Sequence, residues 1–165
     1  MPTLGILTSS DLGSRGQRQD VSGQRIRELL TPYGFEVLRY EVVPDDQPIL
    51  EERLRRWADQ DGLDLIVTTG GTGLTRRDVT PEATCAVVQR EVPGMAEAMR
   101  IQTLKHTPLA MVSRAVVGVR GHTLIINLPG SPKAVQECLE VVLPAISHAL
   151  DMLRETPPPH EASQP

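Results

Sequence analysis

The sequence predicts an α/β fold, a three-layer αβα sandwich around a mostly parallel sheet that includes an antiparallel strand. Short apolar runs alternate with longer segments of helical spacing, which is typical of βαβ units. A hairpin signal late in the chain predicts the antiparallel strand. With 165 residues, 39% of them hydrophobic and 23% charged, the chain has the size and composition of one soluble domain.

The first half of the chain contains three expected strands separated by two expected helices. The strands are "TLGILTSS" (3–10), "FEVLRYEVVP" (35–44) and "LDLIVTT" (63–69), each an apolar or alternating run. The helices are "SGQRIRELLTPYG" (22–34) and "DDQPILEERLRRWADQDG" (45–62), which carry apolar residues at helical spacing. Helices that connect successive strands predict parallel pairing.

The second half of the chain combines helices with one hairpin. The expected helices cover 80–92, 95–105 and 131–155, and Pro93 is expected to end the first of them. The segment "SRAVVGVRGHTLIINLPG" (113–130) holds two β-rich pieces on either side of Gly121, which predicts the hairpin. We expect residues 1–155 to form one domain and the Pro-rich tail "TPPPHEASQP" (156–165) to be disordered.

Composition and charge argue against several functions. The net charge of −4 disfavours binding to nucleic acid, which needs a basic field, and one Trp, two Tyr and one Phe offer few platforms for stacking bases. No apolar run reaches the length of a membrane span, and the N-terminus lacks the basic start of a signal peptide. Cys85 and Cys138 form no CxxC pair, so we expect reduced thiols in a cytoplasmic protein.

Four polar segments follow the expected strands. In an open α/β sheet, ligands bind outside the carboxyl ends of the parallel strands. We therefore expect these segments to converge on one site. The segments are Ser9–Asp11, Asp45–Asp46, Gly70–Asp78 and Pro129–Ser131.

The third of these segments begins with a glycine-rich loop, "TTGGTG". It is not a Walker A loop, because no GK[ST] ending follows, and it is not a dinucleotide fingerprint, because position 76 is Arg76. Glycines still allow backbone N–H groups to face a phosphate closely, and Thr72 adds a hydroxyl. A tight turn without ligand accounts for the same pattern, so both interpretations stay open.

Asp45 and Asp78 are the candidate metal ligands. Carboxylate oxygens at one edge of a sheet suit Mg²⁺, which binds one or two carboxylates together with substrate phosphates. The alternative is structural: Asp45 or Asp46 caps the helix that follows, and Asp78 is a turn residue ahead of Thr80, the expected N-cap of the next helix.

The motif "LPGSPKAVQE" (128–137) offers a second anion site. Ser131 is a good N-cap, Pro132 suits the first turn, and Lys133 adds a charge at a helix N-terminus. Together with Arg76 and Arg77, Lys133 predicts a local positive pocket, although solvated surface charges account for the same residues. The dispersed histidines and the absence of a G-x-S-x-G elbow argue against zinc and covalent catalysis.

Two long motifs, "TTGGTGLTRRDVTPEAT" and "LPGSPKAVQECLE", resemble the molybdopterin-binding family of molybdenum cofactor biosynthesis, and more narrowly its molybdopterin adenylyltransferases. The stretches "TSSDLGSRGQRQDVSG", "VVPDDQ" and "SRAVVGVRGHTLIINLPGSP" agree with the same family. The resemblance extends over about residues 3–150.

The resemblance implies a magnesium-dependent transfer of AMP from ATP to the terminal phosphate of molybdopterin, with release of pyrophosphate. It implies Asp45 and Asp78 as catalytic carboxylates and metal ligands. It also implies a homotrimer and a molybdenum insertase that receives the product. The implied substrate-binding residues are Gly70, Gly71, Thr72, Gly73, Ser10, Ser22, Gly130, Ser131, Pro132 and Lys133. The alternative is a non-catalytic molybdopterin-binding protein of the same pathway.

Overall fold

The structure, a computed structural model, describes residues 1–155 and contains one six-stranded sheet in the order β2-β1-β3-β6-β5-β4. Strands β1, β2, β3 and β6 are parallel, β5 is antiparallel to β6, and β4 is antiparallel to β5. The tail over 156–165 lies outside the described residues. The strands are β1 (Thr3–Ser9), β2 (Glu36–Val43), β3 (Leu65–Thr69), β4 (Arg90–Glu91), β5 (Val117–Arg120) and β6 (Thr123–Leu128).

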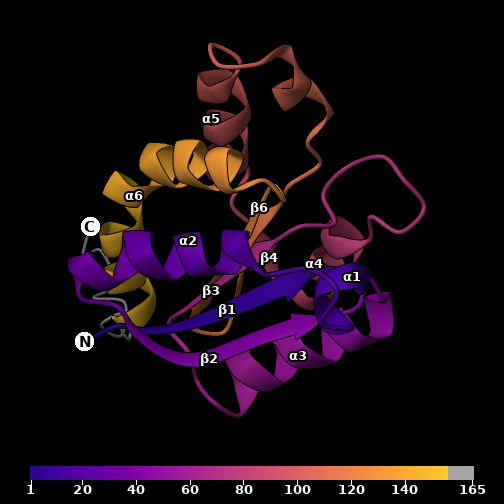
Figure 1. The fold of residues 1–165 in the computed structure, drawn as a ribbon. Coiled ribbons are helices and arrows are strands. Elements are labelled where there is room, and N and C mark those ends of the chain that lie inside the picture. The colour runs from indigo at the N-terminus through magenta and orange to yellow at the C-terminus, as the bar shows by residue number, and fades with distance from the viewer. Residues whose placement is uncertain (156–165) are drawn as a thin grey trace, which may run out of the picture.

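Helices cover both faces of the sheet (Figure 1). Helices α2, α5 and α6 pack on one face, and α3 and α4 pack on the other, which confirms the three-layer αβα prediction. The α-helices are α1 (Asp11–Ser14), α2 (Val21–Leu30), α3 (Gln47–Asp59), α4 (Thr80–Val87), α5 (Pro93–Thr103) and α6 (Pro132–Arg154), and the 3₁₀ helices are η1 (Thr31–Tyr33) and η2 (Pro108–Val112). No helix within residues 1–155 combines the length and the apolar character needed to cross a membrane.

The central strand β3 shows why the sheet needs both layers. Leu65 and Val67 point into the layer of α2, α5 and α6, while Ile66 points into the layer of α3 and α4, where it packs with the fully buried Trp57. A strand buried on both faces is a continuous apolar run, as the sequence shows. Each such side chain contributes about 1.5–3 kcal/mol by leaving water.

The helix expected over 80–92 is wrong in its second half. Helix α4 ends at Val87, and Arg90 and Glu91 form the short edge strand β4. Arg90 pairs with Val119 of β5, so sheet pairing decides the conformation of this segment. Pro93 does not break a helix; it is the first residue of α5, where its missing N–H has no partner to lose.

The chain order creates a crevice at one edge of the sheet. From β1 the chain moves to β2 on one side and then to β3 on the other side, so connections leave β1 in opposite directions. Ligands in open α/β sheets bind at such a switch point, outside the carboxyl ends of the strands.

Candidate functional site

Two adjoining cavities lie at the carboxyl edge of the parallel strands. The first, here called the polar cavity, has a volume of about 600 Å³. The second, here called the apolar cavity, has a volume of about 410 Å³ and lies between the β-strand ends, α5, η2 and α6. The two cavities share the wall residues Gly71, Asp78, Gly130 and Ser131. Together they form one continuous candidate site.

All four polar segments that the sequence singled out contribute to the polar cavity. Of the residues named as candidates, most line this cavity, while Thr72 and Gly73 line the apolar cavity and Lys133 lines neither. Those in the wall of the polar cavity are Ser10, Ser22, Asp45, Gly70, Gly71, Asp78, Gly130, Ser131 and Pro132. The convergence expected from the sheet edge is therefore confirmed.

Asp46, and not Asp45, is the helix cap. Its side chain accepts a hydrogen bond from the Ile49 N–H at 3.1 Å at the start of α3. The Asp45 carboxylate instead accepts from the Ser9 hydroxyl at 2.7 Å and from the Asp11 N–H at 3.0 Å. These two donors hold Asp45 in the wall of the polar cavity without neutralising its charge.

Asp78 is both a turn residue and a cavity residue. Its Oδ2 accepts from the Thr75 N–H at 2.9 Å and from the Thr75 hydroxyl at 2.8 Å, which closes the loop after the glycines. Within the described residues, Oδ1 of Asp78 has no hydrogen bond. One carboxylate oxygen therefore shapes the loop while the other stays available to a ligand.

The glycine turn requires glycine at two positions. Gly70 and Gly71 have φ values of 88° and 68°, in the left-handed region that other residues avoid. A Cβ on Gly70 would lie 2.4 Å from the Ser9 carbonyl oxygen, and one on Gly71 would lie 2.4 Å from Oγ1 of Thr80. The turn thus needs these glycines for its own conformation, and that conformation brings its backbone to the wall of both cavities.

Thr80 does not cap helix α4, contrary to the sequence prediction. The N-cap is Val79, and the Thr80 N–H donates to the Gly71 carbonyl at 3.1 Å, so Thr80 enters the helix as its first residue. Its buried hydroxyl has no hydrogen-bond partner in the part of the chain that the structure describes.

The three serines among the candidates already have internal hydrogen bonds. The Ser10 hydroxyl accepts from the Gly13 N–H at 2.9 Å, and the Ser131 hydroxyl accepts from the Ala134 N–H at 3.1 Å, so each caps a helix. The Ser22 hydroxyl donates to the Gly130 carbonyl at 2.5 Å, which ties α2 to the loop before α6. The main role of these serine hydroxyls is therefore to stabilise the cavity wall, because each already has a partner within the protein.

The basic residues lie differently from the expected positive pocket. Arg77 forms a fork with Asp11, at 2.9 and 2.8 Å, and this guanidinium lowers the pKa of the Asp11 carboxyl. The Lys133 side chain is 82% exposed and lies 3.8 Å from Glu137. The arginines that do line the cavities are Arg18 and Arg100, neither of which the sequence analysis named as a candidate.

Asp20 is a cavity residue that the sequence analysis did not single out. It caps α2 through the Gly23 N–H at 3.0 Å and accepts hydrogen bonds from the hydroxyls of Thr8 and Tyr40. Burial and the bond to Asp20 raise the pKa of Tyr40. An Asp directly before a helix was the available signal.

The carboxylates of Asp45 and Asp78 suit a metal ion that binds together with a substrate phosphate. Within residues 1–155 no group of three or more His, Cys, Asp or Glu side chains is arranged to hold an ion by itself. Asp45 and Asp78 are two hard oxygen donors in one cavity wall. Mg²⁺ binds in this manner, through one or two carboxylates plus substrate phosphates and water, and not in an all-protein cage.

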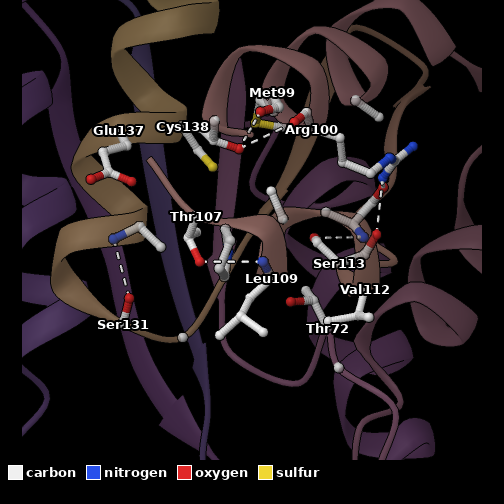
Figure 2. Close-up of a pocket in the computed structure, with 18 of the residues that line it drawn as sticks. Thr72, Met99, Arg100, Thr107, Leu109, Val112, Ser113, Ser131, Glu137 and Cys138 are labelled. Atoms are coloured by element: carbon white, nitrogen blue, oxygen red, sulfur yellow. Dashed lines mark hydrogen bonds between the residues drawn. The ribbon is translucent and has the colours of Figure 1, made fainter. Parts of the chain in front are cut away.

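The apolar cavity suits a flat heterocycle. Figure 2 shows Glu137 and Cys138 of α6 facing the segment of Thr107 and Leu109, with Met99 of α5 beside them. Apolar side chains would cover the faces of a ring, and the carboxylate and hydroxyls would bind its polar edge. Burial raises the pKa of the Cys138 thiol to about 11, which keeps it neutral at physiological pH.

The geometry defines an α/β domain with an acidic, glycine-lined cavity at the carboxyl edge of its parallel strands. Comparison with known proteins identifies the family of this domain. The family described as "Probable molybdopterin binding domain" matches residues 5–148. The chain belongs to this family, and the resemblance seen in the two motifs is confirmed.

Individual relatives are similar over nearly the whole chain. The molybdopterin adenylyltransferase of Helicobacter pylori (strain J99) is 46% identical over 91% of this chain and 86% of its own length. The molybdopterin biosynthesis enzyme MoaB of Thermus thermophilus is 57% identical, covers 93% of this chain and 96% of its own, and superposes with a TM-score of 0.88. The tungsten cofactor synthesizing protein MoaB of Pyrococcus furiosus is 35% identical over 94% and 98% of the two chains, with a TM-score of 0.85.

Proposed function

We propose that this protein is a molybdopterin adenylyltransferase that transfers AMP from ATP to the terminal phosphate of molybdopterin. The observation that carries the proposal is the position of Asp45 and Asp78 in the wall of one cavity, beside the glycine turn and the start of α6. The similarity to adenylyltransferases over most of the chain supports the same activity.

The polar cavity binds the phosphates. The N–H of Gly71 in the glycine turn and that of Lys133 at the start of α6 bind an anion without the cost of reorganising a side chain, since neither donates a hydrogen bond within the described residues. The Gly70 N–H already donates to the Leu128 carbonyl at 3.2 Å and is not available. Arg18 in the same wall adds a positive charge. Thr72 and Gly73 extend the binding surface toward the apolar cavity. Lys133 lies outside both cavities and adds an exposed positive charge at the start of α6.

Asp45 and Asp78 would hold the Mg²⁺ that accompanies ATP. When bound, the ion neutralises phosphate charge and orients the pyrophosphate leaving group. The two carboxylates come from loops after two different strands, so the protein fixes their position relative to the glycine turn. This fixed spacing supplies the positioning that nucleotidyl transfer needs.

The chemistry needs no covalent intermediate with the protein. An oxygen of the terminal phosphate of molybdopterin attacks the α-phosphorus of ATP, and the bond from that phosphorus to the pyrophosphate oxygen breaks. The rim shared by the two cavities brings the two phosphate groups together, while the apolar cavity holds a heterocycle. The protein's contribution is therefore alignment and charge compensation.

The assembly and the cellular setting are part of the same proposal. We expect a cytoplasmic homotrimer that passes adenylylated molybdopterin to a molybdenum insertase, as the family resemblance implies. Light scattering on the purified protein measures the assembly, and a mass other than three chains would contradict the trimer.

Pyrophosphate release tests the activity directly. Purified protein supplied with molybdopterin, ATP and Mg²⁺ should release one pyrophosphate per AMP transferred, and omission of any of the three should stop release. If calorimetry detects molybdopterin binding but the assay detects no pyrophosphate release, the enzymatic function is contradicted and the non-catalytic binding protein is supported.

A further inference from the structure

Arg114 contacts both ends of the loop that carries Asp78. This arginine lies between η2 and β5 and is not part of either cavity wall. Its Nε donates to the Gly73 carbonyl at 2.8 Å, and its Nη2 donates to the Asp78 carbonyl at 2.9 Å. Its backbone N–H donates to the Thr72 carbonyl at 2.9 Å. Three of its hydrogen bonds thus end on the backbone of one loop.

The loop has few other attachments to the body of the protein. Residues 74–77 are exposed, and the bonds between Thr75 and Asp78 lie within the loop itself. At its two ends the loop is attached by the bond from the Gly70 N–H to the Leu128 carbonyl at 3.2 Å and by the packing of Val79 against the core. Between these ends, the exposed ion pair of Arg77 with Asp11 also reaches another element. Exposed ion pairs contribute little, so Arg114 provides the larger part of the constraint on the segment from Gly73 to Asp78.

The shape of the guanidinium explains why an arginine occupies this position. A planar fork donates in several fixed directions at once, whereas a lysine ammonium is a single point on a flexible stem. Two nitrogens of Arg114 bond the two carbonyls, and the third, Nη1, pairs with Glu82 of α4. Glu82 therefore orients the Arg114 guanidinium, which in turn connects the Gly73 and Asp78 carbonyls.

We infer that Arg114 is a positioning residue for adenylyl transfer, which holds the Asp78 carboxylate and the glycine turn at the spacing that the phosphates and the metal require. The inference rests on the proposed function of Asp78. The carbonyl that Arg114 binds is on the same residue as the carboxylate, so a shift of this carbonyl moves the metal ligand with it. Misplacement of a catalytic group by about 1 Å can cost about 100-fold in rate.

The matched control is Arg120, at the opposite end of the hairpin strand β5. Arg120 also pairs with a carboxylate, Asp59, and also donates to a backbone carbonyl, that of Val87 at 2.9 Å. It contacts no residue of either cavity. The substitutions Arg114→Lys and Arg120→Lys therefore remove similar bonds at different ends of the molecule.

Steady-state kinetics and amide exchange are measured on both variants. We expect Arg114→Lys to lower kcat by about 10-fold or more and to raise the Mg²⁺ concentration for half-maximal rate, with a smaller change in KM for ATP. Arg120→Lys should keep the wild-type kcat at a similar melting temperature. In the ligand-free protein, the N–H groups of Thr75 and Asp78 should exchange about 10-fold faster in Arg114→Lys only.

Two results would overturn the inference. One is a wild-type kcat in Arg114→Lys. The other is equal exchange of the loop amides in both lysine variants, which would make Arg114 an ordinary stabilising residue. The exchange measurement needs no turnover, so failure of the positioning role is distinguishable from failure of the proposed function, which would abolish pyrophosphate release in the wild type.

Discussion

At the amino edge of the parallel strands Asp59, Asp61 and Asp64 each bind an arginine, whereas at the carboxyl edge Asp45 and Asp78 form no ion pair within residues 1–155. The first three connect the ends of helices, strands and the hairpin. The other two have only hydroxyl and amide donors as partners. Asp11 at the carboxyl edge also pairs with an arginine, Arg77, but Asp45 and Asp78 do not and remain available to a cation.

The hydrogen bonds and the backbone conformation also differ between the two edges. At the amino edge, Asp64 accepts from both the N–H and the hydroxyl of Thr3, at 2.7 and 3.0 Å, so its binding capacity is used within the fold. At the carboxyl edge a left-handed Gly-Gly turn lies in the cavity wall, beside the buried, unpaired hydroxyl of Thr80. Left-handed glycines also occur at the amino edge, at Gly62 and Gly121, but they line neither cavity. Departures of this kind cost stability and are typical of binding sites.

Substitution of the carboxyl-edge aspartates should have the largest effect on activity. We expect Asp78→Asn and Asp45→Asn each to lower the rate of pyrophosphate release by at least about 100-fold, because each removes one of the two carboxylates that would hold the Mg²⁺ and so weakens the charge compensation of the substrate phosphates. The melting temperature should change little in Asp78→Asn, since a single oxygen accepts both bonds from Thr75. It should fall somewhat in Asp45→Asn, since the Ser9 hydroxyl and the Asp11 N–H bind different oxygens and asparagine keeps one of them. Asp61→Asn at the amino edge is the control and should keep the wild-type rate; a comparable loss of rate there would erase the contrast between the edges.

The glycine turn should be sensitive to a single methyl group. Gly71→Ala places a Cβ 2.4 Å from Oγ1 of Thr80 at a φ of 68°, so we expect a loss of about 1–3 kcal/mol in the free energy of unfolding and a loss of activity. Urea denaturation measures the loss. Gly94→Ala, where the added Cβ meets nothing within 4 Å, is the control and should unfold at the wild-type urea concentration or above it.

The amino edge should respond to pH through Asp64. Burial raises the pKa of this carboxyl, but the bonds from Arg154 and Thr3 outweigh it and lower the pKa overall. Its stabilising contribution is therefore present above the unfolded-state pKa of about 3.9 and is lost as pH falls through the lower folded-state pKa. We expect Asp64→Asn to lose about 1–2 kcal/mol of unfolding free energy at pH 7. If the difference from wild type persisted unchanged below both pKa values, the charge of Asp64 would not be its source.

Arg77 should give the smallest effect. Its ion pair with Asp11 is largely exposed, so solvent and salt weaken it. We expect Arg77→Gln to shift the melting temperature by less than about 2 °C. A large drop would show that this pair, and not Arg114, fixes the loop.

The sequence predicted the layers of the fold because their signals are local. The apolar run of β3 and the helical spacing of α3 follow from burial patterns within a few residues. The end of α4 was not predictable in this way. The helix ends at Val87 because Arg90, just beyond it, pairs with Val119 of β5, which follows 29 residues later (119 − 90).

The site was predictable where strand ends define it and not where distant residues complete it. The four segments after the strands converge as the topology requires. The sequence could not choose between Asp45 and Asp46 as the cap, because both precede the same helix. Arg100 and Arg114 reach the site from a separate helix and loop, and no spacing rule connects them to the glycine turn.

A crystal structure of the protein with Mg²⁺ and a non-hydrolysable ATP analogue tests the joint role of Asp45 and Asp78 most directly. We predict one Mg²⁺ bound by oxygens of both carboxylates and by the phosphates, with the phosphates against the Gly70-Gly71 turn. Phosphates bound outside the polar cavity, or an ion held by neither aspartate, would contradict the proposed site.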